Sequence, residues 1–197
     1  MLLIRREAPK FTADAYFPNG VFKTLSLDDY QGKWVVLIFY PLAFTFACTS
    51  ALTFLSDCKA EFDALNAQVI GVSVDSVYTT HAWTQVERKR GGIADLNFPI
   101  VSDLTHSIGK MYDCLLPTGH HCRATYIIDP NGIVRHFSMN EPAVERNVGE
   151  ILRIIQACKS YDVNGEVCPA NWRKGGKTIK TDVNKKNEYF EAVFGDK

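Results

Sequence analysis

Short runs of apolar residues alternate along the chain with segments whose apolar positions recur at helical spacing. The runs are rich in β-branched and aromatic side chains, and all but the last contain few polar residues. Runs of this kind are typical of strands that are buried on both faces of a sheet. The sequence predicts five such strands, at Trp34–Tyr40, Val69–Val74, Phe98–Val101, Ala124–Ile128 and Ile133–Met139.

The segments between these runs predict helices. After the first run, apolar residues such as Leu52, Leu55 and Phe62 recur near helical spacing, and polar residues mostly take the other face. The pattern predicts helices at Cys48–Asn66, Thr79–Arg90, Asp103–Tyr112 and Asn147–Lys159.

The order of these elements predicts the fold class. Strands that alternate with helices, followed by a hairpin and a last helix, indicate an α/β fold built as a three-layer sandwich. The hairpin follows from Asp129-Pro-Asn-Gly132, a turn signal between two predicted strands. After Asp162, glycines and prolines interrupt the chain, which favours an extended arm. We therefore expect one domain at residues 1–162 and a C-terminal arm at residues 163–197.

Composition and charge narrow the function classes. The chain has 197 residues, of which 46% are hydrophobic, so it is long enough for one well-buried core. Lys plus Arg and Asp plus Glu both number 22, which favours neither nucleic acid nor an anionic membrane as a partner. No apolar run approaches the length of a membrane span, and the first six residues are too short for a signal peptide. We expect a cytoplasmic protein.

Six cysteines are sparse for a disulfide scaffold of this length and favour a reducing compartment with one or two reactive thiols. Cys48 is the first candidate, because it ends the segment from Pro41 to Cys48 that joins a predicted strand to a predicted helix. A helix N-terminus stabilises negative charge on sulfur, so this position suits a thiolate nucleophile. Thr45, one turn earlier, could hydrogen-bond a small reactant, and Pro41 could shield the pocket. The alternative is a small buried apolar residue.

A second candidate thiol lies 120 residues later. Cys168 follows Gly165 and precedes Pro169, a setting that suits thiol–disulfide exchange better than core packing. The two thiols would meet through the fold or through a second subunit. The chain has no Cys-x-x-Cys pair, which argues against an ordinary dithiol site.

Two arginines are candidate electrostatic partners. Arg123 heads a predicted strand, where the fold could bring it beside the helix that Cys48 begins; a surface ion pair is the alternative. Arg146 stands at the start of the last predicted helix, where a cation is opposed by the helix dipole. A paired or functional role is therefore favoured for Arg146.

These residues resemble those of typical two-cysteine peroxiredoxins, which are thioredoxin-dependent peroxidases. The likeness covers essentially the whole chain, and its most specific parts are Pro-x-x-x-Thr-x-x-Cys at 41–48 and Gly-Glu-Val-Cys-Pro at 165–169. Other matching segments are Ala8–Phe11, Val69–Ser76, His81–Trp83, Pro99–Asp103 and Ile127–Asp129, together with Arg123 and Arg146.

The resemblance implies a thioredoxin-like fold and a set of roles. Cys48 would be the peroxidatic thiolate, which attacks a peroxide and becomes a sulfenic acid. Thr45 and Arg123 would bind the peroxide, with Arg146 nearby, and Pro41 would shield the oxidised sulfur. Cys168 of another subunit would resolve the sulfenic acid into a disulfide, which thioredoxin or a similar dithiol protein would reduce.

The resemblance also implies the assembly and its cofactors. A homodimer is the smallest unit expected, because Cys168 must reach another chain, and a ring of dimers, a decamer, would follow. The chemistry needs no metal, haem or flavin. A role as a holdase chaperone or a redox-relay protein with weak peroxidase activity is the alternative function.

The chain departs from the family pattern next to the nucleophile. The family usually reads Cys-Pro-Thr-Glu, whereas this chain reads Cys48-Thr-Ser-Ala51. The family's glutamate bonds the arginine pair, so Ala51 leaves Arg123 and Arg146 without that anchor. Either the arginines are held more loosely and the reaction is slower, or another acceptor takes over, for which Glu145 is a candidate.

Overall fold

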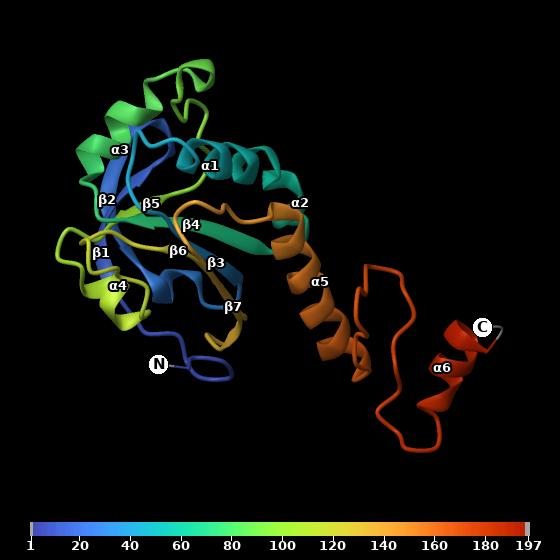
Figure 1. Cartoon of the computed structure of the whole chain (residues 1–197). Helices are drawn as coiled ribbons and strands as arrows, with labels where there is room; N and C mark the ends of the chain where they lie inside the picture. Colours follow the sequence, from blue (N-terminus) through green and yellow to red (C-terminus); the bar gives the residue numbers. More distant parts are fainter. Residues whose placement is uncertain (1, 196–197) are drawn as a thin grey trace. The chain divides into compact units, whose positions relative to one another are not determined.

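The computed structural model describes residues 2–195, which divide into two compact units. The first unit extends to Val148 and the second begins at Gly149. Figure 1 shows a sheet flanked by helices in the first unit, and two helices joined by a long loop in the second. Because the units are not placed relative to one another, each is described by itself.

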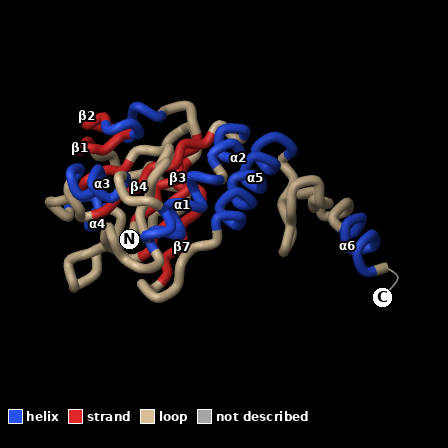
Figure 2. Tube along the Cα trace, turned by 90° about the horizontal axis from the view of Figure 1, so that it is seen from above, coloured by secondary structure: helices blue, strands red, loops and turns tan. Residues whose placement is uncertain are grey.

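The first unit is built on one seven-stranded sheet with the order β2-β1-β5-β4-β3-β6-β7. Figure 2 shows its strands in red among the surrounding helices. The strands are β1 (Thr12–Phe17), β2 (Val21–Ser26), β3 (Trp34–Phe39), β4 (Ala67–Ser73), β5 (Ile100–Ser102), β6 (Arg123–Ile128) and β7 (Val134–Asn140).

The central strand β3 sets the register of the sheet. It runs parallel to β4, with Phe39 opposite Val72, and antiparallel to β6, with Ile38 opposite Thr125. All six residues of β3 are buried, as expected of a strand covered on both faces. The carboxyl end of β3 and the start of β6 therefore meet at the same edge of the sheet.

Helices cover the two faces of the sheet. The helices of the first unit are α1 (Cys48–Asp57), α2 (Lys59–Ala64), α3 (Val77–Thr84) and α4 (Ser107–Met111). The second unit contains α5, which is Val148–Asn164 and starts at the boundary, and α6 (Asn187–Phe194). No helix within residues 2–195 is both long and apolar enough to cross a membrane.

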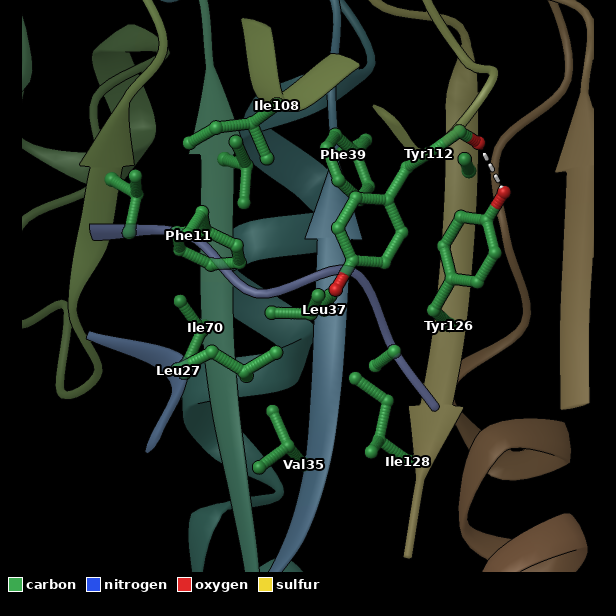
Figure 3. Close-up of a cluster of buried hydrophobic side chains, with 14 of the residues drawn as sticks. Phe11, Leu27, Val35, Leu37, Phe39, Ile70, Ile108, Tyr112, Tyr126 and Ile128 are labelled. Carbon is green, nitrogen blue, oxygen red and sulfur yellow. Dashed lines mark hydrogen bonds between the residues drawn. The ribbon is translucent and has the colours of Figure 1, made fainter. Parts of the chain in front are cut away.

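Alternate residues of β3 point to a large apolar cluster on one face. Figure 3 shows Val35, Leu37 and Phe39 in this cluster with Tyr112 and Tyr126. The Tyr126 hydroxyl donates a hydrogen bond to the Tyr112 carbonyl, and the two rings meet edge to face at 4.9 Å between centroids. Burying the two aromatic rings with the polar tip of Tyr126 satisfied stabilises this side of the sheet.

The structure confirms the predicted α/β sandwich and all five predicted strands, with small shifts of their ends. It also confirms the turn at Asp129, whose carboxylate accepts hydrogen bonds from the backbone N–H groups of Asn131 and Ile133. The sequence analysis missed β1 and β2. Four of the six β2 residues are exposed, so this edge strand lacks the apolar run that marked the others.

Three of the helix predictions needed correction, and the fourth, at 147–159, continues to Asn164. The helix predicted at 48–66 is two helices, because the backbone at Cys58 leaves helical geometry between α1 and α2. The helix predicted at 79–90 starts earlier and ends at Thr84. The helix predicted at 103–112 is the short α4, which begins at Ser107. Asp103 is not part of this helix, because its side chain accepts hydrogen bonds from N–H groups of the first turn.

Asp103 forms a fully buried pair with His121. The Asp103 carboxylate accepts hydrogen bonds from the backbone N–H groups of Ile108, at 3.0 Å, and Gly109, at 2.8 Å. His121 Nε2 lies 3.0 Å from the same carboxylate. Residue 109 must be glycine here, because a Cβ would lie 2.5 Å from His121 Nε2. Burial acts to raise the pKa of Asp103, but these hydrogen bonds outweigh it and the pKa lies below its ordinary value.

This pair predicts an acid-dependent contribution to stability. The ionised Asp103 stabilises the fold at pH values above its ordinary pKa of about 3.9, and the contribution is lost as the pH falls through the lower pKa of the folded state. We expect Asp103→Asn to weaken the pH dependence of the free energy of unfolding, measured by urea unfolding between about pH 6 and about pH 2. The exposed Asp14→Asn is the control, and parallel profiles for the two variants would contradict the prediction.

Candidate active site

The loop from Pro41 to Ala47 leads from the end of β3 to the start of α1. Asp75, which follows β4, anchors this loop: its Oδ2 accepts a hydrogen bond of 2.7 Å from the Ala43 N–H and one of 3.0 Å from the Ser73 hydroxyl. The ring of Phe44, a residue with a positive φ of 57°, packs 5.7 Å from the ring of Trp83. The loop therefore has a polar anchor and an aromatic one.

Cys48 is the first residue of α1 and is fully buried. Its Sγ lies 2.9 Å from Thr45 Oγ1 and 3.3 Å from Arg123 Nη1. A sulfur at a helix N-terminus with two hydrogen-bond donors is an environment that stabilises a thiolate. The structure therefore brings together three of the residues that the sequence singled out, from the loop, from α1 and from β6.

The Thr45 hydroxyl has two acceptors in reach and one proton. Oγ1 lies 2.7 Å from the Leu42 carbonyl oxygen as well as 2.9 Å from the Cys48 sulfur. With a protonated sulfur, the hydroxyl is able to donate to Leu42 and accept from the S–H group. With a thiolate, the hydroxyl proton turns toward sulfur, because a charged acceptor forms the stronger hydrogen bond.

Arg123 is held at three points. Its Nε donates to the Pro142 carbonyl at 2.7 Å, and its Nη1 donates to Glu145 Oε2 at 2.6 Å and to the Cys48 sulfur. The side chain is only 5% exposed. Of the two alternatives for Arg123, the surface ion pair is wrong, since its ion pair is buried beside the Cys48 sulfur.

Arg146 lies in the loop before α5, two residues before the helix begins at Val148. Its Nη2 donates to the Phe39 carbonyl at 2.7 Å, which joins this loop to the end of β3. Burial lowers the pKa of Arg146, with a smaller contribution in the same direction from Arg123, while Glu145 and Cys48 oppose the shift. Arg146 therefore belongs to the same charged cluster without a hydrogen bond to the sulfur.

Pro41 and Cys168 complete the predicted site residues. Pro41 is buried at the start of the loop, directly after β3. Cys168 belongs to the second unit, where its Sγ lies 3.6 Å from the Ala157 carbonyl of α5. Burial raises the pKa of Cys168, opposed by Ser160 and Arg153.

Asp75 and Pro142 are among the residues whose roles the sequence analysis missed. Asp75 lies within Val69–Ser76, one of the segments that resemble peroxiredoxins. Because it follows a buried strand, the sequence could have indicated that it lies at the same edge of the sheet as Cys48. Pro142 acts through its backbone carbonyl, for which a sequence gives no signal. Within residues 2–195, no three His, Cys, Asp or Glu side chains cluster in a way that would hold a metal ion.

Comparison with known proteins assigns the family. Residues 4–137 match the sequence profile described as the AhpC/TSA family, and residues 157–192 match that of the C-terminal domain of 1-Cys peroxiredoxin. This chain is a peroxiredoxin of the AhpC/TSA family.

Relatives of the peroxiredoxin match along nearly its whole length. It is 44% identical over 191 residues to a thioredoxin peroxidase of Trypanosoma brucei rhodesiense, covering 96% of each chain. It is 45% identical to Peroxiredoxin-4 of Dictyostelium discoideum, over 96% of this chain and 73% of the relative. The crystal structure of reduced 2-Cys peroxiredoxin from Plasmodium vivax superposes with a TM-score of 0.94 at 40% identity, over 97% of this chain and all of that one. The comparison confirms the thioredoxin-like peroxiredoxin fold.

The anchoring role of Asp75 is testable without any activity measurement. We expect Asp75→Ala to leave the Ala43 N–H without its acceptor and to speed hydrogen exchange at this amide, measured by NMR or mass spectrometry. A lost hydrogen bond to a charged group corresponds to about 1.5–3 kcal/mol, so exchange should quicken by roughly 10- to 100-fold. Amides in the centre of β3 serve as the internal reference, and unchanged protection at Ala43 would contradict the assignment.

Proposed function

We propose that this peroxiredoxin is a thiol-dependent peroxidase that reduces hydrogen peroxide and alkyl hydroperoxides with Cys48 as its nucleophile. The observation that carries the proposal is the fully buried Cys48 sulfur, which lies at a helix N-terminus within 3.3 Å of donors from Thr45 and Arg123. Relatives named thioredoxin peroxidase and thioredoxin-dependent peroxide reductase support the same reaction class.

The first step follows from the donors around the sulfur. The Cys48 thiolate attacks one oxygen of the peroxide, an S–O bond forms, and the O–O bond breaks with its electron pair on the leaving oxygen. That oxygen takes up a proton and departs as water or an alcohol, and Cys48 is left as a sulfenic acid. Thr45 and Arg123 bind the peroxide and stabilise the charge that develops on oxygen. Arg146 supports the positive field, and Pro41 shields the oxidised sulfur.

The second step needs another thiol. We assign it to Cys168 of a second copy, in the arm formed by residues 163–197, while residues 1–162 form the peroxidase domain. Attack of the Cys168 sulfur on the sulfenic acid forms a disulfide and releases water. Thioredoxin, or a similar dithiol protein, then reduces the disulfide by thiol–disulfide exchange. The proposed assembly is a homodimer and, beyond it, a ring of five dimers, the decamer implied by the resemblance.

The site favours the peroxidase over the alternative role as a holdase chaperone or redox relay. A chaperone role requires no arginine hydrogen-bonded to a buried sulfur, whereas peroxide reduction does. The cytoplasmic location stays a prediction, since the relatives include a mitochondrial protein of the mouse and a chloroplastic protein of barley.

The first test removes the nucleophile. We expect Cys48→Ser to abolish peroxide consumption in an assay with thioredoxin, thioredoxin reductase and NADPH, because the proposal places the nucleophile at the helix N-terminus beside Thr45 and Arg123. Cys58→Ser is the matched control and should keep full activity, since burial and neighbouring acids raise the pKa of Cys58 and leave it a poor nucleophile. Undiminished turnover in the Cys48 variant would refute the assignment.

The second test addresses resolution. Peroxide-treated wild-type protein should migrate at the size of a disulfide-linked dimer in non-reducing electrophoresis. Cys168→Ser should remove that band, yet Cys48 should still be oxidised in a single turnover, as measured by labelling of the sulfenic acid. Monomer-sized bands alone from oxidised wild-type protein would contradict resolution between subunits.

A further inference from the structure

Glu145 bridges the two buried arginines of the site. Its Oε2 accepts a hydrogen bond of 2.6 Å from Arg123 Nη1, and its Oε1 lies 3.3 Å from Arg146 Nε and 3.1 Å from the Arg146 backbone N–H. The Glu145 side chain is 16% exposed, against 5% for Arg123 and 3% for Arg146. All three charges are therefore largely removed from water.

Two arginines buried this closely repel one another. The positive charge of Arg123 contributes to the lowered pKa of Arg146, and Glu145 is the largest influence that opposes the shift. Without a carboxylate between them, the guanidinium groups would separate or draw in water, because unpaired buried charges are strongly unfavourable. Glu145 therefore holds together two side chains that electrostatics would otherwise drive apart.

The bridge also fixes the direction of the contact with sulfur. Arg123 Nη1 makes both contacts: it donates a hydrogen bond to Glu145 and lies 3.3 Å from the Cys48 sulfur. The Pro142 carbonyl fixes the guanidinium at Nε, and Glu145 fixes it at Nη1. Two fixed points determine the plane of a rigid guanidinium and hence where its remaining N–H groups point.

The backbone at Glu145 is held by a residue of the preceding strand. The Glu145 carbonyl accepts a hydrogen bond of 3.3 Å from the side chain of Asn140, at the end of β7. The helix that begins at Cys48, α1, has no carboxylate in its first turn, and Ala51 is buried there. The anchor of Arg123 thus comes from the loop between β7 and α5.

We infer that Glu145 is a positioning residue, which holds Arg123 against Cys48 for the reaction with peroxide. The inference rests on the proposed peroxidase function. Glu145 does not touch the sulfur and does not transfer a proton; it acts through Arg123. Because its charge is negative, it would not by itself favour the thiolate, so its contribution is geometric.

The test compares two reactions of the same thiol in the full-length protein. We expect Glu145→Gln to slow single-turnover oxidation of Cys48 by hydrogen peroxide by roughly 10- to 100-fold, the effect typical of a misplaced catalytic group. Alkylation of Cys48 by iodoacetamide, followed by mass spectrometry, needs the thiolate and access but no stabilised leaving oxygen. Its rate should change far less. Glu145→Asp keeps the charge but withdraws it from the arginines, so its peroxide rate should also fall.

Glu141→Gln is the matched control, since it removes the same charge from an exposed position in the same loop and should leave both rates unchanged. A wild-type peroxide rate in either Glu145 variant would overturn the inference, and so would an equal loss in both reactions. A wild-type protein that does not react with peroxide would instead refute the proposed function.

Discussion

A buried cation beside a buried sulfur is the interaction on which the rest of this structure depends. Arg123 Nη1 lies 3.3 Å from the Cys48 sulfur, and neither side chain has appreciable contact with water. A guanidinium in such a place must have its other donors satisfied, or the burial would be too unfavourable to persist. The Pro142 carbonyl and the Glu145 carboxylate supply those partners. The loop between β7 and α5 therefore follows a path that brings both to the start of β6.

The central strand explains why such distant residues meet. Cys48 follows β3, Arg123 begins β6, and Asp75 follows β4, so all three stand at one edge of the sheet. Parallel pairing of β3 with β4 and antiparallel pairing of β3 with β6 make that convergence a property of the register. The Arg146 hydrogen bond to the Phe39 carbonyl adds the loop after β7 to the same edge. The site is therefore attached to the most deeply buried strands, which keep it rigid.

The sequence could predict those parts of this arrangement that produce a local pattern of residues. The apolar runs of β3 to β7 indicated the sheet, and the spacing of Pro41, Thr45 and Cys48 indicated the proposed nucleophile. The edge strand β2 and its neighbour β1 gave no such pattern, because a half-exposed strand lacks a continuous apolar run. The short α4 was overestimated, since Asp103 is used to cap the helix and pair with His121. Contacts made by a backbone carbonyl, such as that of Pro142, depend on the path of the folded chain. Because every residue has such a carbonyl, the residue types could not predict these contacts.

The complete burial of Cys48 has a consequence for the proposed reaction. For a peroxide to reach the sulfur, the surrounding side chains must move, so the rate under the proposal is the intrinsic rate multiplied by the open fraction. Asp75 and Trp83 hold the closed form through Ala43 and Phe44. The same closure discriminates by size, because bulky disulfides and electrophiles need a wider opening than a peroxide does. Selectivity for small oxidants would then be a property of loop closure as much as of sulfur chemistry.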